Sequence, residues 1–317
     1  MKKILITRPL PAHVIQKAKT FGDVSVRAQT TPLSKKEMLS ALLNYDIILP
    51  TLGDLFSEKI FEQVEKPKCK LLANFGVGYN HINVTAANRR GIMVSNTPGA
   101  VTDATADIAL TLMLMTARRA GEGERVLRSG KWEGWHPTQM LGLHMSGKTV
   151  SIIGMGRIGE AIARRCYFGF GMKVVYASRS KKQMDFPSTQ LSSVKEAVVD
   201  ADFVIAAVPG GAATKHLVGQ ELFALMPSHS IFVNISRGDV VDEVALIDAL
   251  QTGQIGGAGL DVYEFEPVVP NELIQLENVT LLPHLGTASL EVRSEMGDMA
   301  LKNIEDFIEG RRPKNIV

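Results

Sequence analysis

The sequence lacks three features that would each point to a particular class of protein. Only two cysteines occur, Cys69 and Cys166, far apart and without a metal-type partner spacing, so neither a disulfide framework nor a zinc site is expected. No window approaches the ~20 consecutive apolar residues that are needed to cross a bilayer. The 35 basic and 33 acidic side chains nearly cancel, without the basic stripe of a nucleic-acid reader. We therefore expect a cytoplasmic protein with reduced thiols and no metal, membrane or nucleic-acid partner.

What is present is typical of an ordinary globular enzyme. The chain has 317 residues, of which 45% are hydrophobic, and this length exceeds what one core usually organises, so two domains are expected. The first ten residues, MKKILITRPL, resemble a secretion signal only superficially, because Pro9 and Pro11 cut the apolar run short. We interpret Lys3–Thr7 as a first buried strand. No internal repeat or low-complexity segment occurs.

In the first part of the chain, short apolar runs alternate with amphipathic stretches, which predicts parallel strands joined by crossover helices. The runs are Ile4–Thr7, Val24–Val26, Ile47–Leu49, Leu71–Phe75 and Ile92–Val94. The breaker Asn96-Thr97-Pro98-Gly99 follows them. Beyond it, one long helix is expected from Asp103 to about Leu127, apolar nearly all round in its first half and charged in its second.

After Lys148 the alternation resumes, and it predicts a doubly wound sheet. The predicted strands are Thr149–Ile153, Lys173–Ala177, Phe203–Ala207, Ile231–Ile235, Gly257–Val262 and Val279–Leu282. A last helix, about Ser289–Glu309, is expected to cross back to the first domain. We expect an α/β fold of two doubly wound domains, in which a Rossmann-type cofactor domain (99–287) is inserted into a smaller flavodoxin-like substrate domain (1–98 and 288–317).

A glycine fingerprint follows the strand predicted at Thr149–Ile153. The segment Gly154-Met155-Gly156-Arg157-Ile158-Gly159 opens a helix that we expect to run through Arg165. In this context the first glycine permits a tight turn, the second lets the backbone approach a pyrophosphate, and the third lets helix and strand pack closely. The pyrophosphate would meet the helix N-terminus. The pattern predicts a bound dinucleotide rather than a glycine-rich turn without a ligand.

The end of the next strand indicates which dinucleotide is bound. An acid about 20 residues past the glycines normally binds the ribose 2′-hydroxyl of NAD(H), but this strand end reads Tyr176-Ala177-Ser178-Arg179-Ser180-Lys181-Lys182. A hydroxyl beside Arg and Lys suits a 2′-phosphate, which accepts charge-assisted hydrogen bonds. NADP(H) is therefore expected, with contacts from Ser178, Arg179 and Ser180. NAD(H), or a basic loop that is merely solvated, is the alternative.

Three further segments carry polar residues at the carboxyl ends of predicted strands, where open α/β sheets bind ligands. They read NISRGD from Asn234, LDVYEFEP from Leu260 and LPHLG from Leu282. The order of the glycine fingerprint, ISRGDVVDE, GLDVYEFEP and LPHLG resembles the D-2-hydroxyacid dehydrogenase family over essentially the whole chain. With GKW-x-GW-x-P at Gly130–Pro137 and the SRSKK strand end, it is most similar to the glyoxylate/hydroxypyruvate reductases of that family.

The resemblance implies hydride transfer from NADPH to a small 2-oxo acid, with Arg237, Glu266 and His284 as the catalytic residues. Their chemistry suits this reaction. A guanidinium can hold a carboxylate and polarise a ketone, and an imidazole can donate a proton near neutral pH. A carboxylate beside the imidazole favours its protonated form. Two alternatives stay open: Arg237 as a structural ion-pair partner, and Glu264 in place of Glu266.

The resemblance also implies further contacts with the cofactor. Asp261 would accept a hydrogen bond from the nicotinamide carboxamide, although a strand-end Asp can equally cap a turn. The other positions implied at the cofactor site are Thr105, Arg157, Ile158, Val208, Pro209, Ile235, Arg237, His284 and Gly286.

In the first domain, Asn74-Phe75-Gly76-Val77-Gly78-Tyr79 follows a strand and offers consecutive backbone amides, a nest that suits an anion. The resemblance implies that the amides of Val77 and Gly78 hold the substrate carboxylate, across a cleft from Arg237; a plain tight turn is the alternative. It further implies a homodimer in which Trp135, less favourably Trp132, narrows the substrate pocket of the neighbouring subunit. An aromatic anchor in the dimer contact alone is nearly as well supported.

Two other functions remain open. An NAD-dependent dehydrogenase of 3-phosphoglycerate or another D-2-hydroxy acid would want an acid at the position of Ser178, and none is present there. A dinucleotide-sensing corepressor or scaffold is possible because fold does not settle function. The presence of all three catalytic residue types favours an enzyme over the second alternative.

Overall fold

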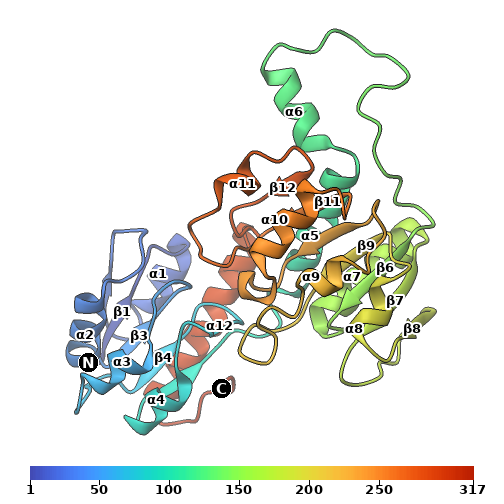
Figure 1. Ribbon diagram of the computed structural model, residues 1–317. Helices are drawn as coiled ribbons and strands as arrows, with labels where there is room; N and C mark the ends of the chain where they lie inside the picture. The colour runs from blue at the N-terminus through green and yellow to red at the C-terminus, as the bar shows by residue number, and fades with distance from the viewer. The chain divides into compact units, whose positions relative to one another are not determined.

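The computed structural model describes residues 1–317 and divides into two compact units. Unit 1 comprises Met1–Val101 and Thr287–Val317, and unit 2 comprises Thr102–Gly286. The predicted boundary after residue 98 lies three residues before the observed one after Val101 (101 − 98). The predicted start of the second segment at residue 288 lies one residue after the observed start at Thr287 (288 − 287). Unit 2 is thus inserted into the chain of unit 1 (Figure 1).

Unit 1 is built on a five-stranded parallel sheet in the order β2-β1-β3-β4-β5. Its order is that of flavodoxin-like folds. The sequence predicted all five strands, because each contains a short apolar run and most of their residues are buried or partly buried. They are β1 (Lys3–Ile6), β2 (Asp23–Val26), β3 (Ile47–Leu49), β4 (Leu71–Ala73) and β5 (Met93–Ser95).

Helices cover both faces of this sheet, and each face has its own apolar core. Helices α1 (Ala12–Ala18) and α12 (Leu290–Ile308) pack on one face. The last helix predicted from the sequence is therefore present and belongs to unit 1. The other face is covered by α2 (Lys35–Asn44), α3 (Glu58–Glu62) and α4 (Val84–Arg89).

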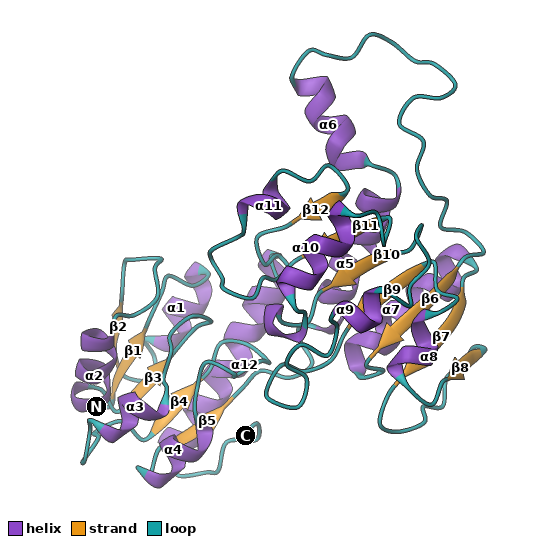
Figure 2. Cartoon of the chain, viewed as in Figure 1, coloured by secondary structure: helices purple, strands orange, loops and turns teal.

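Unit 2 is built on a seven-stranded parallel sheet in the order β12-β11-β10-β9-β6-β7-β8 (Figure 2). If the strands are numbered from β6 as strand 1, their order is 3-2-1-4-5-6-7. This is the order 3-2-1-4-5-6 of dinucleotide-binding folds with one more strand at the end. The apolar pattern predicts six of these strands but not β8, whose residues are Ser-Thr-Gln. The strands are β6 (Thr149–Ile153), β7 (Lys173–Ala177), β8 (Ser188–Gln190), β9 (Phe203–Ala206), β10 (Ile231–Asn234), β11 (Gly257–Leu260) and β12 (Val279–Leu281).

The helices of unit 2 also form two layers. Helices α5 (Thr102–Ala117) and α7 (Arg157–Phe170) share one core with the sheet. The opposite core includes side chains of α8 (Val194–Val198), α9 (Gln220–Phe223), α10 (Glu243–Gln251) and α11 (Asn271–Ile274). No helix of the chain combines the length and the apolar character that a membrane span requires.

The prediction of a single long helix from Asp103 to about Leu127 is wrong. The structure has α5, a break at Arg119 with a φ of 50°, and then α6 (Ala120–Arg128). The cause is tertiary: the amide of Leu143 donates to the carbonyl oxygen of Ala117 at 2.8 Å. The returning chain thus satisfies a carbonyl at the end of α5 that a longer helix would have used itself.

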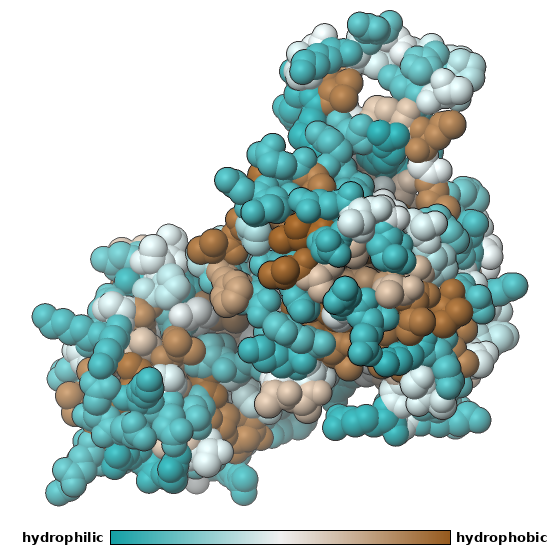
Figure 3. All heavy atoms as spheres, in the orientation of Figure 1, coloured by the Kyte–Doolittle hydropathy of each residue, from teal (hydrophilic) through white to brown (hydrophobic).

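Helix α6 and the loop after it form an arm that extends from the rest of unit 2 (Figure 1). No residue of α6 is buried. Figure 3 shows apolar residues scattered among polar ones on this arm, which carries Leu127, Trp132, Trp135 and Leu141 as exposed side chains. Trp135 is 79% exposed and Trp132 is 52% exposed.

The contact between α1 and α12 yields a stability prediction. A Cβ added to Gly297 would lie 2.5 Å from a methyl carbon of Val14, which is fully buried. We expect Gly297→Ala to lower the free energy of unfolding by about 1–3 kcal/mol, the usual cost of overpacking. Urea unfolding curves of the variant and the wild type measure this difference.

Gly169→Ala in α7 is the matched control for this substitution. Gly169 is exposed and nothing lies within 4 Å of an added Cβ, so the variant should gain up to about 1 kcal/mol from helix propensity. A Gly297→Ala protein as stable as the wild type would contradict the packing described.

Candidate active site

The glycine fingerprint has the geometry that a dinucleotide requires. Gly154 has a φ of +102°, and an added Cβ would lie 2.7 Å from both the Ala207 oxygen and a methyl carbon of Val208. An added Cβ on Gly159 would lie 2.2 Å from the Gly154 oxygen, so helix and strand approach too closely for a side chain. Nothing lies within 4 Å of an added Cβ on Gly156, which leaves its backbone open to a ligand.

This loop lies where the strand order of the sheet reverses, between β6 and its neighbour β9. Dinucleotides bind at such a switch point. Helix α7 starts here with Gly156 as its N-cap and without a side-chain cap, so the first-turn amides, including those of Arg157 and Ile158, remain available to an anion. Val208 and Pro209 follow β9 on the other side of the same point. The residues present therefore fit a dinucleotide.

The loop after β7 is polar and basic. The Ser178 hydroxyl donates to the Ser180 oxygen at 2.6 Å, and Gln190 donates to the Ser178 oxygen at 2.9 Å. Arg179 and Ser180 are exposed, and no acidic residue occurs among residues 177–183. These contacts fix the backbone of the loop while its arginine stays in solvent.

Arg237 follows β10, and its backbone is tightly positioned. The Asn234 side chain donates to the Arg237 oxygen at 3.0 Å, and its own oxygen accepts from the Ser236 amide and hydroxyl. A Cβ added to Gly238 would lie 1.9 Å from the Tyr263 carbonyl. Only glycine permits this approach between the Arg237 turn and the loop after β11.

The guanidinium of Arg237 is a partly buried cation without a carboxylate in direct contact. It donates to the Ser236 oxygen at 2.7 Å. Burial lowers the pKa of Arg237, while the nearby charges of Glu266 and Asp239 raise it. A buried cation that lacks an ion-pair partner is costly, and an anionic ligand would remove this cost. The structural ion-pair alternative for Arg237 thus has no partner in this structure.

Glu266 and His284 form a direct pair. The His284 Nδ1 lies 2.9 Å from the Glu266 Oε2, and the Glu266 Oε1 accepts from the Tyr263 amide at 3.1 Å. Burial alone raises the pKa of Glu266, but His284, the Tyr263 amide and Arg237 together bring it below its ordinary value. Glu264 is instead paired with His216 at 2.8 Å. The structure therefore brings Glu266, not Glu264, to the imidazole.

His284 has a backbone conformation that is unusual for a residue with a side chain. Its φ is 54°, a left-handed conformation that non-glycine residues rarely adopt outside functional or turn positions. Both oxygens of Asp261 stabilise the following residues, accepting from the amides of Leu285 at 2.6 Å and Gly286 at 2.8 Å. The Nε2 of His284 has no such partner, so it can face a ligand.

Asp261 thus has the turn-capping geometry that was left open as an alternative. It is buried, and burial raises the pKa of its carboxyl group despite the two amide donors. The Thr105 hydroxyl donates to the Gly286 oxygen at 3.3 Å, which ties the same turn to α5. Ile235 is buried at the end of β10. A contact of Asp261 or Thr105 with a cofactor remains a prediction.

In unit 1, the loop Phe75–Gly78 follows β4 at the carboxyl edge of its sheet. The amides of Val77 and Gly78 make no hydrogen bond within the protein, which is the arrangement expected of an anion-binding nest.

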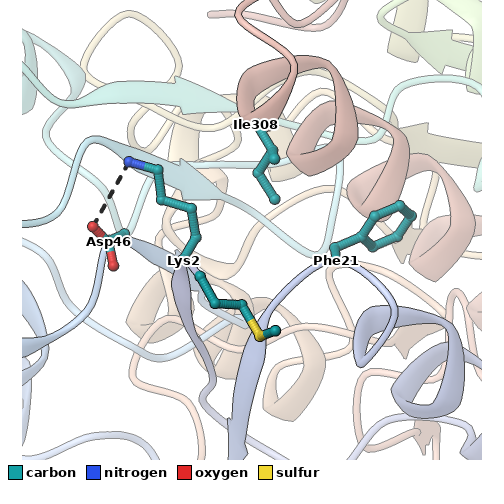
Figure 4. A pocket seen from close by; sticks show the side chains of 5 residues that line it. Lys2, Phe21, Asp46 and Ile308 are labelled. Carbon is teal, nitrogen blue, oxygen red and sulfur yellow. Dashed lines mark ion pairs between the residues drawn. The ribbon is translucent and has the colours of Figure 1, made fainter.

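A separate pocket is lined by Met1, Lys2, Phe21, Asp46 and Ile308 (Figure 4). Lys2 and Asp46 precede β1 and β3, so this pocket lies at the amino edge, where such sheets do not usually bind ligands.

The sequence interpretation missed the role of Asn234 in holding a functional loop, whereas turn capping was one of the two roles it considered for Asp261. Asn234 orders the Arg237 turn, and Asp261 orders the His284 turn. Both are polar residues at buried strand ends, where an apolar residue would suffice for packing alone. This position is the signal that could have indicated a hydrogen-bonding role.

Comparison with known proteins identifies the family of this chain. Residues 110–286 match the family model described as D-isomer specific 2-hydroxyacid dehydrogenase, NAD binding domain. A glyoxylate reductase from Thermococcus kodakarensis is 40% identical over 99% of this chain and 96% of its own length.

Solved structures are similar over the full length. An NADPH-dependent glyoxylate/hydroxypyruvate reductase from Sinorhizobium meliloti, in complex with NADP and malonate, has a TM-score of 0.88 at 32% identity and covers 100% of this chain and 96% of its own. A glyoxylate reductase from Paecilomyes thermophila has a TM-score of 0.86 at 29% identity, covering 100% and 98%. On this full-length similarity and the matching family model, the chain belongs to the D-isomer specific 2-hydroxyacid dehydrogenase family.

Proposed function

We propose that this protein uses NADPH to reduce a small 2-oxo acid, glyoxylate or hydroxypyruvate, to the D-2-hydroxy acid. The observation that carries the proposal is the His284–Glu266 pair at 2.9 Å, whose carboxylate also lies near the unpaired cation Arg237. Ketone reduction of this kind uses an acid that donates a proton, a carboxylate that positions the acid, and a cation that binds the substrate carboxylate. Relatives named glyoxylate reductase support the substrate class.

Each residue has a separate role in this proposal. When bound, the cofactor supplies the hydride that adds to the ketone carbon. Arg237 binds the substrate carboxylate and polarises the ketone, because its planar fork offers several donors at once. His284 donates its Nε2 proton to the ketone oxygen as the alcohol forms. Glu266 holds the imidazole through Nδ1 and stabilises its charged form.

Three further assignments belong to the proposal. The free amides of Val77 and Gly78 provide a second anchor for the substrate carboxylate. The exposed Trp135 reaches the substrate pocket of a second copy of the chain in a homodimer, since an isolated subunit leaves it 79% exposed. Asp261 and Thr105 position the turn at Gly286 on the nicotinamide side.

We also propose that NADP(H) is preferred over NAD(H). The support is the basic loop Ser178-Arg179-Ser180, which offers a 2′-phosphate a cation and hydroxyls and places no carboxylate beside it. A related structure was solved in complex with NADP.

The direct test is the oxidation of NADPH and of NADH in the presence of glyoxylate, hydroxypyruvate and larger 2-oxo acids. We expect turnover with the two short acids and a lower KM for NADPH than for NADH. If both cofactors bind but no 2-oxo acid is reduced, the protein is a dinucleotide-binding module and the proposal fails.

Ser178→Asp should reverse the cofactor preference. The new carboxylate would repel a 2′-phosphate and accept a hydrogen bond from the 2′-hydroxyl of NADH, so the KM for NADPH should rise about tenfold or more, the equivalent of ~1.4 kcal/mol. Ser228→Asp adds the same charge at an exposed serine in the loop before β10, at the amino edge of the sheet, and serves as a control. An unchanged ratio of the two Michaelis constants would contradict the assignment of this loop.

Glu266→Gln should lower kcat by about 10²-fold, the effect of a poorly positioned general acid. Because the pKa of Glu266 lies below its ordinary value, the wild-type pair persists at neutral pH and is lost only as the pH falls through that lowered value. Glu264→Gln is the matched control, and an equal effect of both substitutions would refute the specific role of Glu266.

A further inference from the structure

The loop Gly76–Gly78 owes its conformation to three buried polar side chains that the proposed reaction does not use. The Asn74 Nδ2 donates to the carbonyl oxygens of Gly76 at 2.9 Å and Gly78 at 3.0 Å. Asn96 donates to the intervening Val77 oxygen at 2.8 Å. All three consecutive carbonyl groups are therefore bound by side-chain amides.

His81 completes this arrangement. Its Nε2 lies 3.0 Å from the Asn74 Oδ1. Because the amide nitrogen of Asn74 already donates to two carbonyls, its oxygen must accept, so His81 carries a proton on Nε2. Asn74 is 1% exposed and His81 is 9% exposed, so water is largely excluded from these bonds and they are stronger for it.

The bound carbonyl groups determine where the amide groups of the same peptide planes point. In each peptide plane the N–H and the C=O point in opposite directions, so binding the carbonyls into the protein directs the neighbouring amides outward. The amides of Val77 and Gly78 are those that make no bond within the protein. Gly76, with a φ of +150°, permits the turn that this requires.

We infer that Asn74 and His81 are positioning residues that preorganise the Val77 and Gly78 amides for the substrate carboxylate. This inference rests on the proposed function. It assigns two residues that affect substrate affinity by ordering the backbone of the loop. Neither residue touches the reacting atoms. Since the carboxylate is held equally before and during hydride transfer, a disordered loop should raise KM more than it lowers kcat.

Asn74→Asp tests this directly, because it keeps the shape of the side chain and removes the two donated hydrogen bonds. We expect the KM for glyoxylate to rise by about tenfold to a hundredfold, the usual cost of a small misplacement of binding groups. The affinity for NADPH, measured by its fluorescence, should stay that of the wild type. Oxalate titrated into the NADPH-saturated enzyme should bind more weakly by the same factor.

Asn80→Asp is the matched control for the added charge. Asn80 lies in the same loop region, is exposed, and donates no hydrogen bond to it. It should change KM by no more than about twofold, as is usual for surface substitutions. A comparable increase for both variants would mean that charge alone acts, and it would overturn the inference.

A second pair of variants separates positioning from folding. His81→Leu removes the donor to Asn74 and should raise KM in the same direction, whereas His81→Gln can restore a donor at the Nε2 position and should recover most of the affinity. This pair carries the test if Asn74→Asp fails to fold. Wild-type KM values in both Asn74→Asp and His81→Leu would overturn the inference and leave the proposed function intact. A wild-type protein that reduces no 2-oxo acid would overturn both.

Discussion

The candidate site depends on the parallel pairing of β10, β11 and β12. Their register joins Asn234 to Leu260 and Leu260 to Leu281, so the three strands end at one edge of the sheet. Arg237, Glu266 and His284 follow these ends by a few residues each. Residues that are 29 and 18 positions apart in the sequence (266 − 237 and 284 − 266) are thereby placed in one neighbourhood.

Hydrogen bonds from side chains to the backbone, together with one close backbone approach, hold the loops at this edge. Gly238 lets the Arg237 turn approach Tyr263, and Asp261 holds the turn after His284 through two backbone amides. The two bonds to Asp261 stabilise the turn that follows His284, whose own backbone is left-handed. Unit 1 uses the same device, with Asn74 and Asn96 binding the carbonyls of a functional loop. In both units a buried polar side chain orders the backbone that meets the ligand.

The sequence predicted the strands well because those of a doubly wound sheet are continuous apolar runs between helices. It predicted the fingerprint because each glycine has a distinct steric reason. It failed for β8, which is short and polar, and for the end of α5, which a hydrogen bond from Leu143 determines. The roles of Asn234 and Asn74 depend on contacts after a turn, which no local pattern specifies, whereas the strand-end position of Asp261 indicates turn capping as one of its possible roles. Position at a strand end could indicate such residues, but not their partners.

The central claim is that His284, held by Glu266, is the proton donor. His284→Ala tests it most directly, with turnover and NADPH affinity measured on the same preparation. The account predicts that kcat falls by about 10²-fold or more, the usual contribution of a positioned acid, while NADPH binds as it does to the wild type. Turnover at the wild-type rate would contradict it.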